Sequence, residues 1–369
     1  MKVAIEARAL ANHGGGVNRY VKNLLTKLTQ KSDQLSCYPI VDSPVPIETN
    51  IHKAVVVKRY GAIGLNYWLN RQVEKKLHEI HPDVVHYTKA DVPSHKVRPT
   101  VVTIYDVIPL LMPSSQKLSR RWYWPGALQR AADKSDHILT ISEASKRDIC
   151  ERLRVEPDKI SVTTLCVDDR FRDLPEKSTG EANILFVGTL EPRKNIGALL
   201  KAFARIHQQI PHRLIIAGKA YKGAGEWLTL AQKLKIDDRV SWRGFVSEGE
   251  LRGLYSQADL FVWPSVYEGW GFPPQEAMAH GVPVIVSNGG ALPEVVGDGG
   301  EIVNFYKDRL SDRLLDVLFV DDLSSRILAV LQDKKRQAEM AEKGRKRAIL
   351  NSWDGVVEKT IDVYKKVAG

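Results

Sequence analysis

Two adjacent cations follow a buried strand near the middle of the sequence. The segment ILFVGTLEPRKN (residues 184–195) predicts a strand, then a short loop with Arg193 and Lys194, then a helix. A helix N-terminus exposes unpaired N–H groups and partial positive charge, so two cations there predict a diphosphate site. An arginine grips phosphate with a planar fork, whereas a lysine acts as a mobile point charge. A solvated basic turn is the alternative, but the position at the carboxyl end of a domain's first strand favours the site.

Two carboxylates lie further along in YEGWGFPPQEAMAHG (residues 267–281), where seven residues separate Glu268 from Glu276. The double proline at 273–274 is suited to start a helix, so Glu268 is expected in a loop and Glu276 in the first turns of that helix. The glycines of the loop let backbone amides approach a ligand closely. Carboxylates accept hydrogen bonds from sugar and ribose hydroxyls, which favours a sugar-binding site over two solvated surface groups.

The elements around these residues alternate between β-rich apolar runs and helix patterns, which is typical of parallel βαβ units. Strands are predicted near 3–7, 37–41, 84–87, 101–105, 137–141, 184–187, 214–217, 240–244, 260–263 and 282–286. A helix is predicted at 196–206, a capping box of Ser247 with Glu250 opens another at 251–258, and Gly281 is expected to end a third. No element is assigned to 308–322. A chain of 369 residues exceeds one hydrophobic core, and the polar stretch at 174–182 reads as a linker, so we predict two Rossmann-like domains, 1–175 and 176–352.

The composition fits an ordinary soluble enzyme, with 43% hydrophobic and 27% charged residues. No apolar run is long enough to span a membrane, the N-terminus reads as a first strand rather than a signal peptide, and three widely spaced cysteines are expected to be reduced in a cytoplasmic protein. The net charge is +10, of which +8 lies in residues 1–175. That excess attracts phosphates, nucleic acid or anionic lipid headgroups and does not choose among them.

The motifs together resemble the retaining GT-B glycosyltransferases of the family 4 type. The resemblance rests on GTLEPRKN, on EGWGFPPQEAMAHGVPVIVS and on GGALPEVVGDGG in the second half. Weaker matches are GGGVNRY after the first strand, YDVIPL at 105–110 and TISEASKRDI at 140–149. NSWD at 351–354 resembles the point where the final helix, 353–369, returns to the N-terminal domain. The resemblance covers nearly the whole chain and implies a GT-B fold, with a cleft between two Rossmann-like domains.

The resemblance also implies roles for individual residues. Arg193 and Lys194 would neutralise the leaving diphosphate without a metal ion, Glu268 would hold a donor-sugar hydroxyl, and Asp106 would face the acceptor. The nucleotide sugar would be bound by Glu276 on the ribose, by the stretch near the base, and by amides around the sugar and phosphates; these residues are Gly15, Gly16, Gly244, Phe245, Val246, Trp270, Gly271, Phe272 and Glu276. Retention would follow from front-face attack. Contacts near the reacting carbon tighten in the transition state, so Glu268→Gln should lower mainly kcat and Glu276→Gln should raise mainly KM.

Three features depart from the family pattern. Tyr105 precedes Asp106 where the family commonly has histidine, and a tyrosine hydroxyl can donate a hydrogen bond but does not titrate near neutral pH. Trp270-Gly271-Phe272 is bulkier than the usual Phe-Gly-Leu, and the stretch after Asn304 is longer than typical. The first departure leaves room for altered sugar choice, weak activity or a catalytically inactive sugar-binding homologue.

The style of the motifs resembles the branch rich in mannosyltransferases, so GDP-mannose is the first expected donor, before UDP-sugars and dTDP-rhamnose. The expected acceptor is a glycan or lipid-linked oligosaccharide at the inner membrane face, as in O-antigen or exopolysaccharide assembly. The basic aromatic segment SRRWYWPGALQR (residues 119–130) is a candidate membrane or acceptor contact, and a packed helix start is its alternative. A nucleotide-sugar epimerase or phosphorylase on the same fold and a basic nucleic-acid-binding protein are the rivals, although no nucleic-acid-binding signature is present.

Overall fold

The computed structural model describes residues 1–11, 15–31, 33–44, 54–59, 64–96, 98–113, 118–168, 171, 181–220, 225–305 and 312–369. Backbone contacts divide the chain into an N-terminal unit, Met1–Leu165 with Asn351–Gly369, and a C-terminal unit, Cys166–Leu350. The division therefore falls after Leu165, earlier than the boundary predicted after residue 175. The reason is packing: Cys166 is fully buried, and the Phe171 ring meets the His280 ring edge-on at 5.6 Å between centroids. Residues 174–180 of the predicted linker lie outside the described residues.

The N-terminal unit is a seven-stranded parallel sheet with strand order β3-β2-β1-β4-β5-β6-β7. Its strands are β1 (Lys2–Glu6), β2 (Ser36–Val41), β3 (Val55–Val56), β4 (Val84–Tyr87), β5 (Thr100–Thr103), β6 (His137–Thr140) and β7 (Ile160–Val162). Its helices are α1 (Gly16–Thr29), α2 (Leu65–Tyr67), α3 (Glu74–Ile80), α4 (Ile108–Leu111), α5 (Leu118–Lys134), α6 (Glu143–Leu153) and α14 (Trp353–Ala368), with a π-helical turn η2 (Trp68–Val73) between α2 and α3. The strand order reverses direction between β1 and β4. Sheets of this kind bind ligands at the carboxyl ends of the strands on either side of such a reversal.

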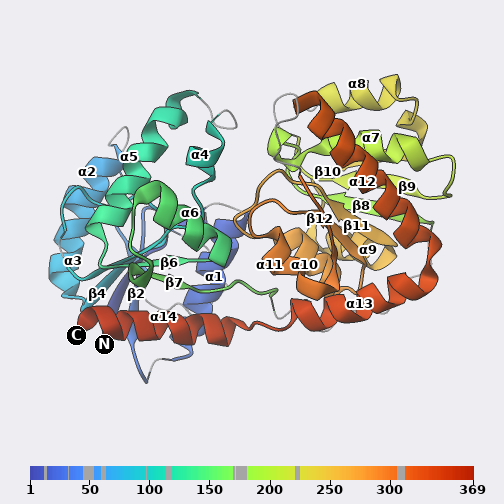
Figure 1. Ribbon diagram of the computed structural model, residues 1–369. Coiled ribbons are helices and arrows are strands. Elements are labelled where there is room, and N and C mark those ends of the chain that lie inside the picture. Colours follow the sequence, from blue (N-terminus) through green and yellow to red (C-terminus); the bar gives the residue numbers. More distant parts are fainter. Residues whose placement is uncertain are drawn as a thin grey trace. The chain divides into compact units, whose positions relative to one another are not determined.

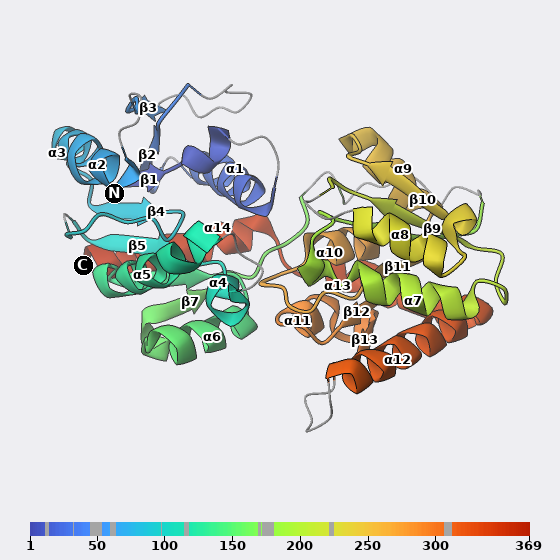
Figure 2. The ribbon, with the colours of Figure 1, turned by 90° about the horizontal axis from the view of Figure 1, so that it is seen from above.

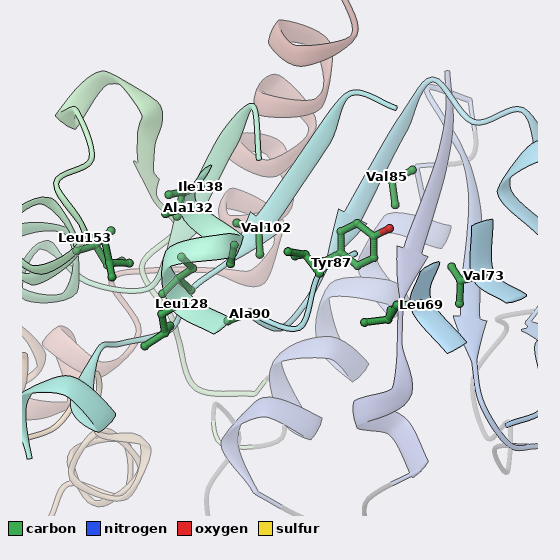
Figure 3. Close-up of a cluster of buried hydrophobic side chains, with 14 of the residues drawn as sticks. Leu69, Val73, Val85, Tyr87, Ala90, Val102, Leu128, Ala132, Ile138 and Leu153 are labelled. Carbon is green, nitrogen blue, oxygen red and sulfur yellow. The ribbon is translucent and has the colours of Figure 1, made fainter. Parts of the chain in front are cut away.

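One face of the N-terminal sheet carries a continuous apolar layer (Figure 3). Val85 and Tyr87 lie two residues apart on β4, on one face of the sheet, and belong to the same buried cluster as Leu128 of α5. The opposite face is covered by α14 together with α1, and α14 contacts β4, β5 and β6 (Figure 1). Ser352 caps α14 by accepting a hydrogen bond from the Gly355 N–H at 3.2 Å. The C-terminal helix is therefore part of the core of the first unit.

The C-terminal unit is a six-stranded parallel sheet with strand order β10-β9-β8-β11-β12-β13. Its strands are β8 (Asn183–Val187), β9 (Arg213–Ala217), β10 (Val240–Gly244), β11 (Leu260–Trp263), β12 (Val284–Ser287) and β13 (Glu301–Val303). Its helices are α7 (Ile196–Ile206), α8 (Gly225–Lys233), α9 (Glu248–Gln257), α10 (Phe272–Ala279), α11 (Leu292–Val296), α12 (Asp312–Gln332) and α13 (Lys334–Ala348), and helices cover both faces of the sheet (Figure 2). Within each unit the order is that of a doubly wound α/β sheet, so the predicted pair of Rossmann-like domains is confirmed. The cleft expected between them stays a prediction.

Most predicted elements agree with the structure. The capping box is present, with the Glu250 carboxylate accepting from the Ser247 N–H at 2.7 Å, and it opens α9 three residues earlier than predicted. Gly281 follows α10 with a φ of 69°, the left-handed conformation expected where a helix ends. The strands β3, β7 and β13 were missed, and the stretch without an assigned element enters α12 at Asp312. No helix within the described residues is long and apolar enough to cross a membrane.

Candidate active site

The carboxyl ends of β8 and β11 lie side by side at the point where the C-terminal sheet reverses its strand order. The loop after β8 leads through a short 3₁₀ turn, η6 (Pro192–Lys194), into α7, and the loop after β11 leads into α10. The Val266 N–H donates to the Arg193 carbonyl at 2.9 Å, and Arg193 Nη1 donates to the Tyr267 carbonyl at 2.6 Å. These bonds fix the two loops to each other, so residues from the two predicted motifs meet at one edge of the sheet.

The Glu268 carboxylate is the centre of this meeting point. Its Oε1 accepts hydrogen bonds from Lys194 Nζ at 2.6 Å, from Ser265 Oγ at 2.6 Å and from Trp263 Nε1 at 3.2 Å. Its Oε2 accepts one from Arg193 Nη1 at 2.7 Å. A carboxylate offers about two acceptor positions per oxygen. Oε1 is therefore saturated, and Oε2 retains capacity for one further donor.

Charge and burial reinforce each other in this cluster. Glu268 is 7% exposed and Lys194 is 8% exposed. Burial alone would raise the pKa of Glu268, but the Lys194 and Arg193 cations and their hydrogen bonds outweigh it and lower that pKa below its usual value. Burial lowers the pKa of Lys194, and the neighbouring Arg193 adds to this effect while Glu268 opposes it. Glu268 is thus an ionised acceptor that helps Lys194 to keep its proton.

A second carboxylate, Glu191, approaches the same cations from a more exposed position. Its Oε1 lies 2.6 Å from Arg193 Nη2 and 4.0 Å from Lys194 Nζ. The Glu191 side chain is 28% exposed, whereas the Glu268 side chain is 10% exposed. The ammonium of Lys194 makes one hydrogen bond within the described residues, to Glu268, which leaves two of its three donors for a ligand.

Glu276 belongs to a separate network. It lies in α10, is 4% exposed, and its Oε2 accepts a hydrogen bond from the Tyr255 hydroxyl of α9 at 2.8 Å. His280 closes the same helix, because its Nδ1 donates to the Glu276 carbonyl at 2.9 Å. Burial lowers the pKa of His280, so its ring is neutral around pH 7 and acts as a helix cap. The two glutamates of the motif are therefore held by different partners.

The remaining candidates of the C-terminal unit divide into exposed and packed residues. Phe245 is 83% exposed beside Gly244, the last residue of β10, which has a φ of 63°. Trp270 is only 6% exposed, and its Nε1 donates to Gln275 Oε1 at 3.1 Å, so its indole is a packing group. At Gly271 an added Cβ would lie 3.0 Å from the Leu292 side chain, which explains a glycine there. Val246 follows Phe245, and Phe272 is the first residue of α10.

Three candidates belong to the N-terminal unit. Gly15 has a φ of 93° and directly precedes Gly16, the first residue of α1. Asp106 Oδ1 accepts a hydrogen bond from the Ile108 N–H at 2.9 Å at the start of α4. The Tyr105 ring packs edge-on against Tyr20 at 5.3 Å, and burial raises its pKa well above 10, so the hydroxyl keeps its proton. Its oxygen has no hydrogen-bond partner within the described part of the chain.

Some residues of the site were missed in the sequence. Trp263 and Ser265 lie in the apolar stretch LFVWPS, which predicts only a buried strand, and Tyr255 is part of a helix pattern. The N-terminal unit holds a comparable pair that was also missed: Glu6 is the last residue of β1 and Arg8 follows it, as Arg193 and Lys194 follow β8. That shared position was the signal that could have found them.

Comparisons with known proteins show the family of the chain. Residues 14–171 match the Glycosyltransferase Family 4 description, and residues 167–347 match Glycosyl transferases group 1. The O-antigen chain mannosyltransferase B of Escherichia coli is 32% identical over 73% of this chain and 71% of its own length. The MMP alpha-(1->4)-mannosyltransferase of Mycolicibacterium hassiacum is 33% identical over 68% of this chain and 59% of its own length. The chain therefore belongs to the group 1 glycosyltransferases.

Solved structures support the fold. The sucrose-phosphate synthase of Thermosynechococcus elongatus superimposes with a TM-score of 0.78 at 18% identity, covering 99% of this chain and 98% of the other. The Anabaena protein HepE in complex with UDP and glucose gives a TM-score of 0.72 at 16% identity, covering 99% of both chains. These neighbours share the GT-B architecture of two Rossmann-like domains.

Proposed function

We propose that this glycosyltransferase moves mannose from GDP-mannose, with retention of the anomeric configuration, onto a growing glycan or lipid-linked oligosaccharide such as an O-antigen chain. The observation that carries the proposal is the cluster of Lys194, Arg193 and Glu268 at the carboxyl ends of β8 and β11. Such an edge of a doubly wound sheet is where nucleotides bind. The names of two relatives, both mannosyltransferases, support the choice of sugar.

The cluster explains how a diphosphate would be held and released. The Lys194 ammonium makes one hydrogen bond among the described residues, to Glu268, and this buried carboxylate helps to keep the ammonium charged. An incoming diphosphate competes with the more exposed Glu191 for Arg193, so this carboxylate is the one expected to move away. The cations then stabilise the negative charge that develops on the leaving phosphate.

The donor's other parts find partners in the same unit. The unused capacity of Glu268 Oε2 suits a hydroxyl of the sugar next to the diphosphate. Glu276 would accept from the ribose, and the exposed Phe245 ring would cover the base. Retention would follow if the leaving phosphate oxygen accepts the acceptor's proton on the face from which it departs.

A ligand screen tests the donor. GDP, UDP and dTDP are compared by thermal shift, because a ligand at 100 times its Kd adds about 2.7 kcal/mol of stability. We expect the largest stabilisation with GDP, and GDP-mannose should be consumed only when an acceptor glycan is present. Stabilisation by UDP alone would mean that the donor is a UDP-sugar and that the transferred sugar is not mannose. Consumption of the nucleotide sugar without an acceptor would favour an epimerase over a transferase.

We propose that no metal ion is needed, because Lys194 and Arg193 supply the positive charge that a divalent ion would otherwise provide. Turnover should therefore be unchanged after treatment with EDTA. Loss of turnover that magnesium or manganese restores would contradict this part of the proposal.

A further inference from the structure

Trp263, the last residue of β11, is buried beneath the predicted diphosphate site. It is 1% exposed, and its ring stacks on Phe186 of β8 with 4.9 Å between centroids and 15° between ring planes. Gly188 follows β8, and a Cβ added there would lie only 2.5 Å from the indole. The absence of a side chain at Gly188 thus allows the indole to lie across the end of the neighbouring strand.

The indole contacts both charged partners of the cluster. The Lys194 ammonium lies 4.6 Å from the centroid of the Trp263 ring, a cation–π distance. The indole Nε1 donates to Glu268 Oε1 at 3.2 Å. One rigid side chain therefore limits where the ammonium can sit and also holds the carboxylate that pairs with it.

A buried ammonium needs such partners because few water molecules can reach it. The flexible stem of a lysine would otherwise let the ammonium search many positions, and fixing it costs side-chain entropy. Stacking on Phe186 and the open space at Gly188 fix the position of the indole. The indole in turn contacts Lys194 and Glu268. Ser265 donates a further hydrogen bond to the same oxygen of the Glu268 carboxylate.

We propose that Trp263 is a positioning residue that preorganises the Lys194 ammonium for the diphosphate of the donor, its ring face acting on Lys194 and its N–H acting on Glu268. The inference rests on the proposed function, since it assigns Lys194 to the donor. It predicts that the effect of Trp263 on the affinity for a free nucleoside diphosphate requires Lys194.

The first test is a double-mutant cycle on the affinity for GDP, measured by calorimetry. Trp263→Leu should weaken GDP binding about tenfold, which is the scale of a desolvated cation–π contact with its entropy effect. Trp263→Phe keeps a ring face and loses the N–H, so it should weaken binding only about threefold. In a Lys194→Ala background, Trp263→Leu should cause no further loss. An equal loss in both backgrounds would overturn the proposal.

A matched control separates positioning from general packing. Phe203 is a fully buried aromatic residue of α7 in the same unit, so Phe203→Leu removes a buried ring away from the site and leaves a smaller cavity than Trp263→Leu does. This variant should lower the melting temperature while its GDP affinity stays at the wild-type value. A loss of affinity in Phe203→Leu equal to that in Trp263→Leu would show that the effect is structural.

A second readout needs no nucleotide. Amine-reactive labelling of Lys194, followed by mass spectrometry of the folded protein, should become several times faster in Trp263→Leu and stay unchanged in Phe203→Leu. Unchanged labelling in Trp263→Leu would refute the inference about Trp263. If the labelling changes as expected but GDP, UDP and dTDP all fail to bind, the proposed function fails while the contact between Trp263 and Lys194 stands.

Discussion

Each unit has a buried acid–cation cluster near the carboxyl end of its first strand, but the charges of the two clusters are distributed differently. In the N-terminal unit the Glu6 carboxylate accepts from Arg8 Nε at 2.7 Å, and Arg8 Nη2 lies 3.5 Å from Asp91. The Arg8 guanidinium also lies 5.3 Å from the centroid of the Trp68 ring, as Lys194 lies over its own tryptophan. The two similar sheets therefore carry the same kinds of side chain near the carboxyl end of their first strand.

The difference lies in the balance between cations and carboxylates. One cation of the N-terminal cluster faces two carboxylates, and Glu6 and Arg8 are 1% and 8% exposed. In the C-terminal cluster two cations face one deeply buried carboxylate, Glu268, and a second that is more exposed. A net negative cluster repels phosphate, whereas the C-terminal cluster can gain an anion when its exposed carboxylate turns away. A place at the end of the first strand is therefore not enough to make a diphosphate site.

The largest expected effect contrasts one cation from each cluster. Lys194→Ala should lower turnover about 100-fold, the scale for losing a preorganised donor to developing charge. Arg8→Lys keeps the charge of the N-terminal cluster and should leave the affinity for GDP within about twofold of wild type. Steady-state kinetics and calorimetry measure the two quantities. Equal losses of GDP affinity in both variants would abolish the distinction drawn between the clusters.

The next effect sharpens the role of the buried carboxylate. The sequence alone predicts that Glu268→Gln lowers mainly kcat, but its ion pairs give it a second task. Without Glu268, burial and the neighbouring Arg193 lower the pKa of Lys194 further. Lys194 must be protonated to hold a diphosphate, so the affinity for GDP should now fall as pH rises. The affinity for GDP is expected to be lower at pH 9 than at pH 7, with kcat reduced at least tenfold throughout.

Glu276→Gln is the matched control for this pH dependence. Glu276 bonds to Tyr255 rather than to the two cations, so its variant should raise KM for the nucleotide sugar by a factor that does not vary with pH. Calorimetry with GDP across the same pH range distinguishes the variants. Parallel pH profiles for the two glutamine variants would show that Glu268 does not sustain the charge on Lys194.

Part of the fold and of the site can be predicted from the sequence. The bounds of four elements were predicted to the residue, because clear turn residues flank their apolar residues; these elements are β4, β10, β11 and α7. β3 has two residues and β13 has three, too short for a period to emerge. Trp263 was overlooked for a different reason: a tryptophan in a buried strand is usually core, and only the neighbouring strand end and loop reveal that a lysine lies over its ring.

The pH dependence of stability depends in part on His86, a fully buried histidine of the N-terminal unit. His86 Nδ1 lies 2.7 Å from the Tyr364 hydroxyl of α14, and its Nε2 lies 2.8 Å from Thr103 Oγ1. Burial lowers the pKa of His86 to about 3. Between that value and the ordinary 6.5 the unfolded chain binds a proton that the folded chain does not, so stability falls as pH falls.

The expected loss is about 1.4 kcal/mol for each pH unit below roughly 6, summed over the window in which only the unfolded state is protonated. His86→Gln cannot titrate, so the difference in unfolding free energy between wild type and variant should shrink as pH falls from 7 to 5. Urea unfolding at several pH values measures this difference. A difference that stays constant would mean that His86 is protonated within the folded unit.

The smallest expected effect concerns the surfaces of the two units. On α5, Trp122 is 84% exposed, next to the exposed Arg120 and Arg121, and residues 1–175 carry most of the net positive charge. We propose that this surface docks on anionic lipid, where each cation contributes about 1 kcal/mol and an aromatic ring sits at the headgroup level.

Replacing Arg120 and Arg121 together by alanine should therefore weaken binding to phosphatidylserine-containing vesicles several-fold, and 0.5 M salt should release the wild type because it shortens the Debye length to about 4 Å. The control removes the same charge from the C-terminal unit: Lys335 and Lys343 lie on exposed positions of α13, and their replacement by alanine should leave vesicle binding unchanged. Sedimentation with vesicles measures both variants, and circular dichroism shows that each remains folded. If the two double variants lose affinity equally, net charge rather than this surface governs docking. Binding that persists in 0.5 M salt would instead assign the contact to Trp122 and its apolar neighbours, because burial of apolar surface is not screened by ions.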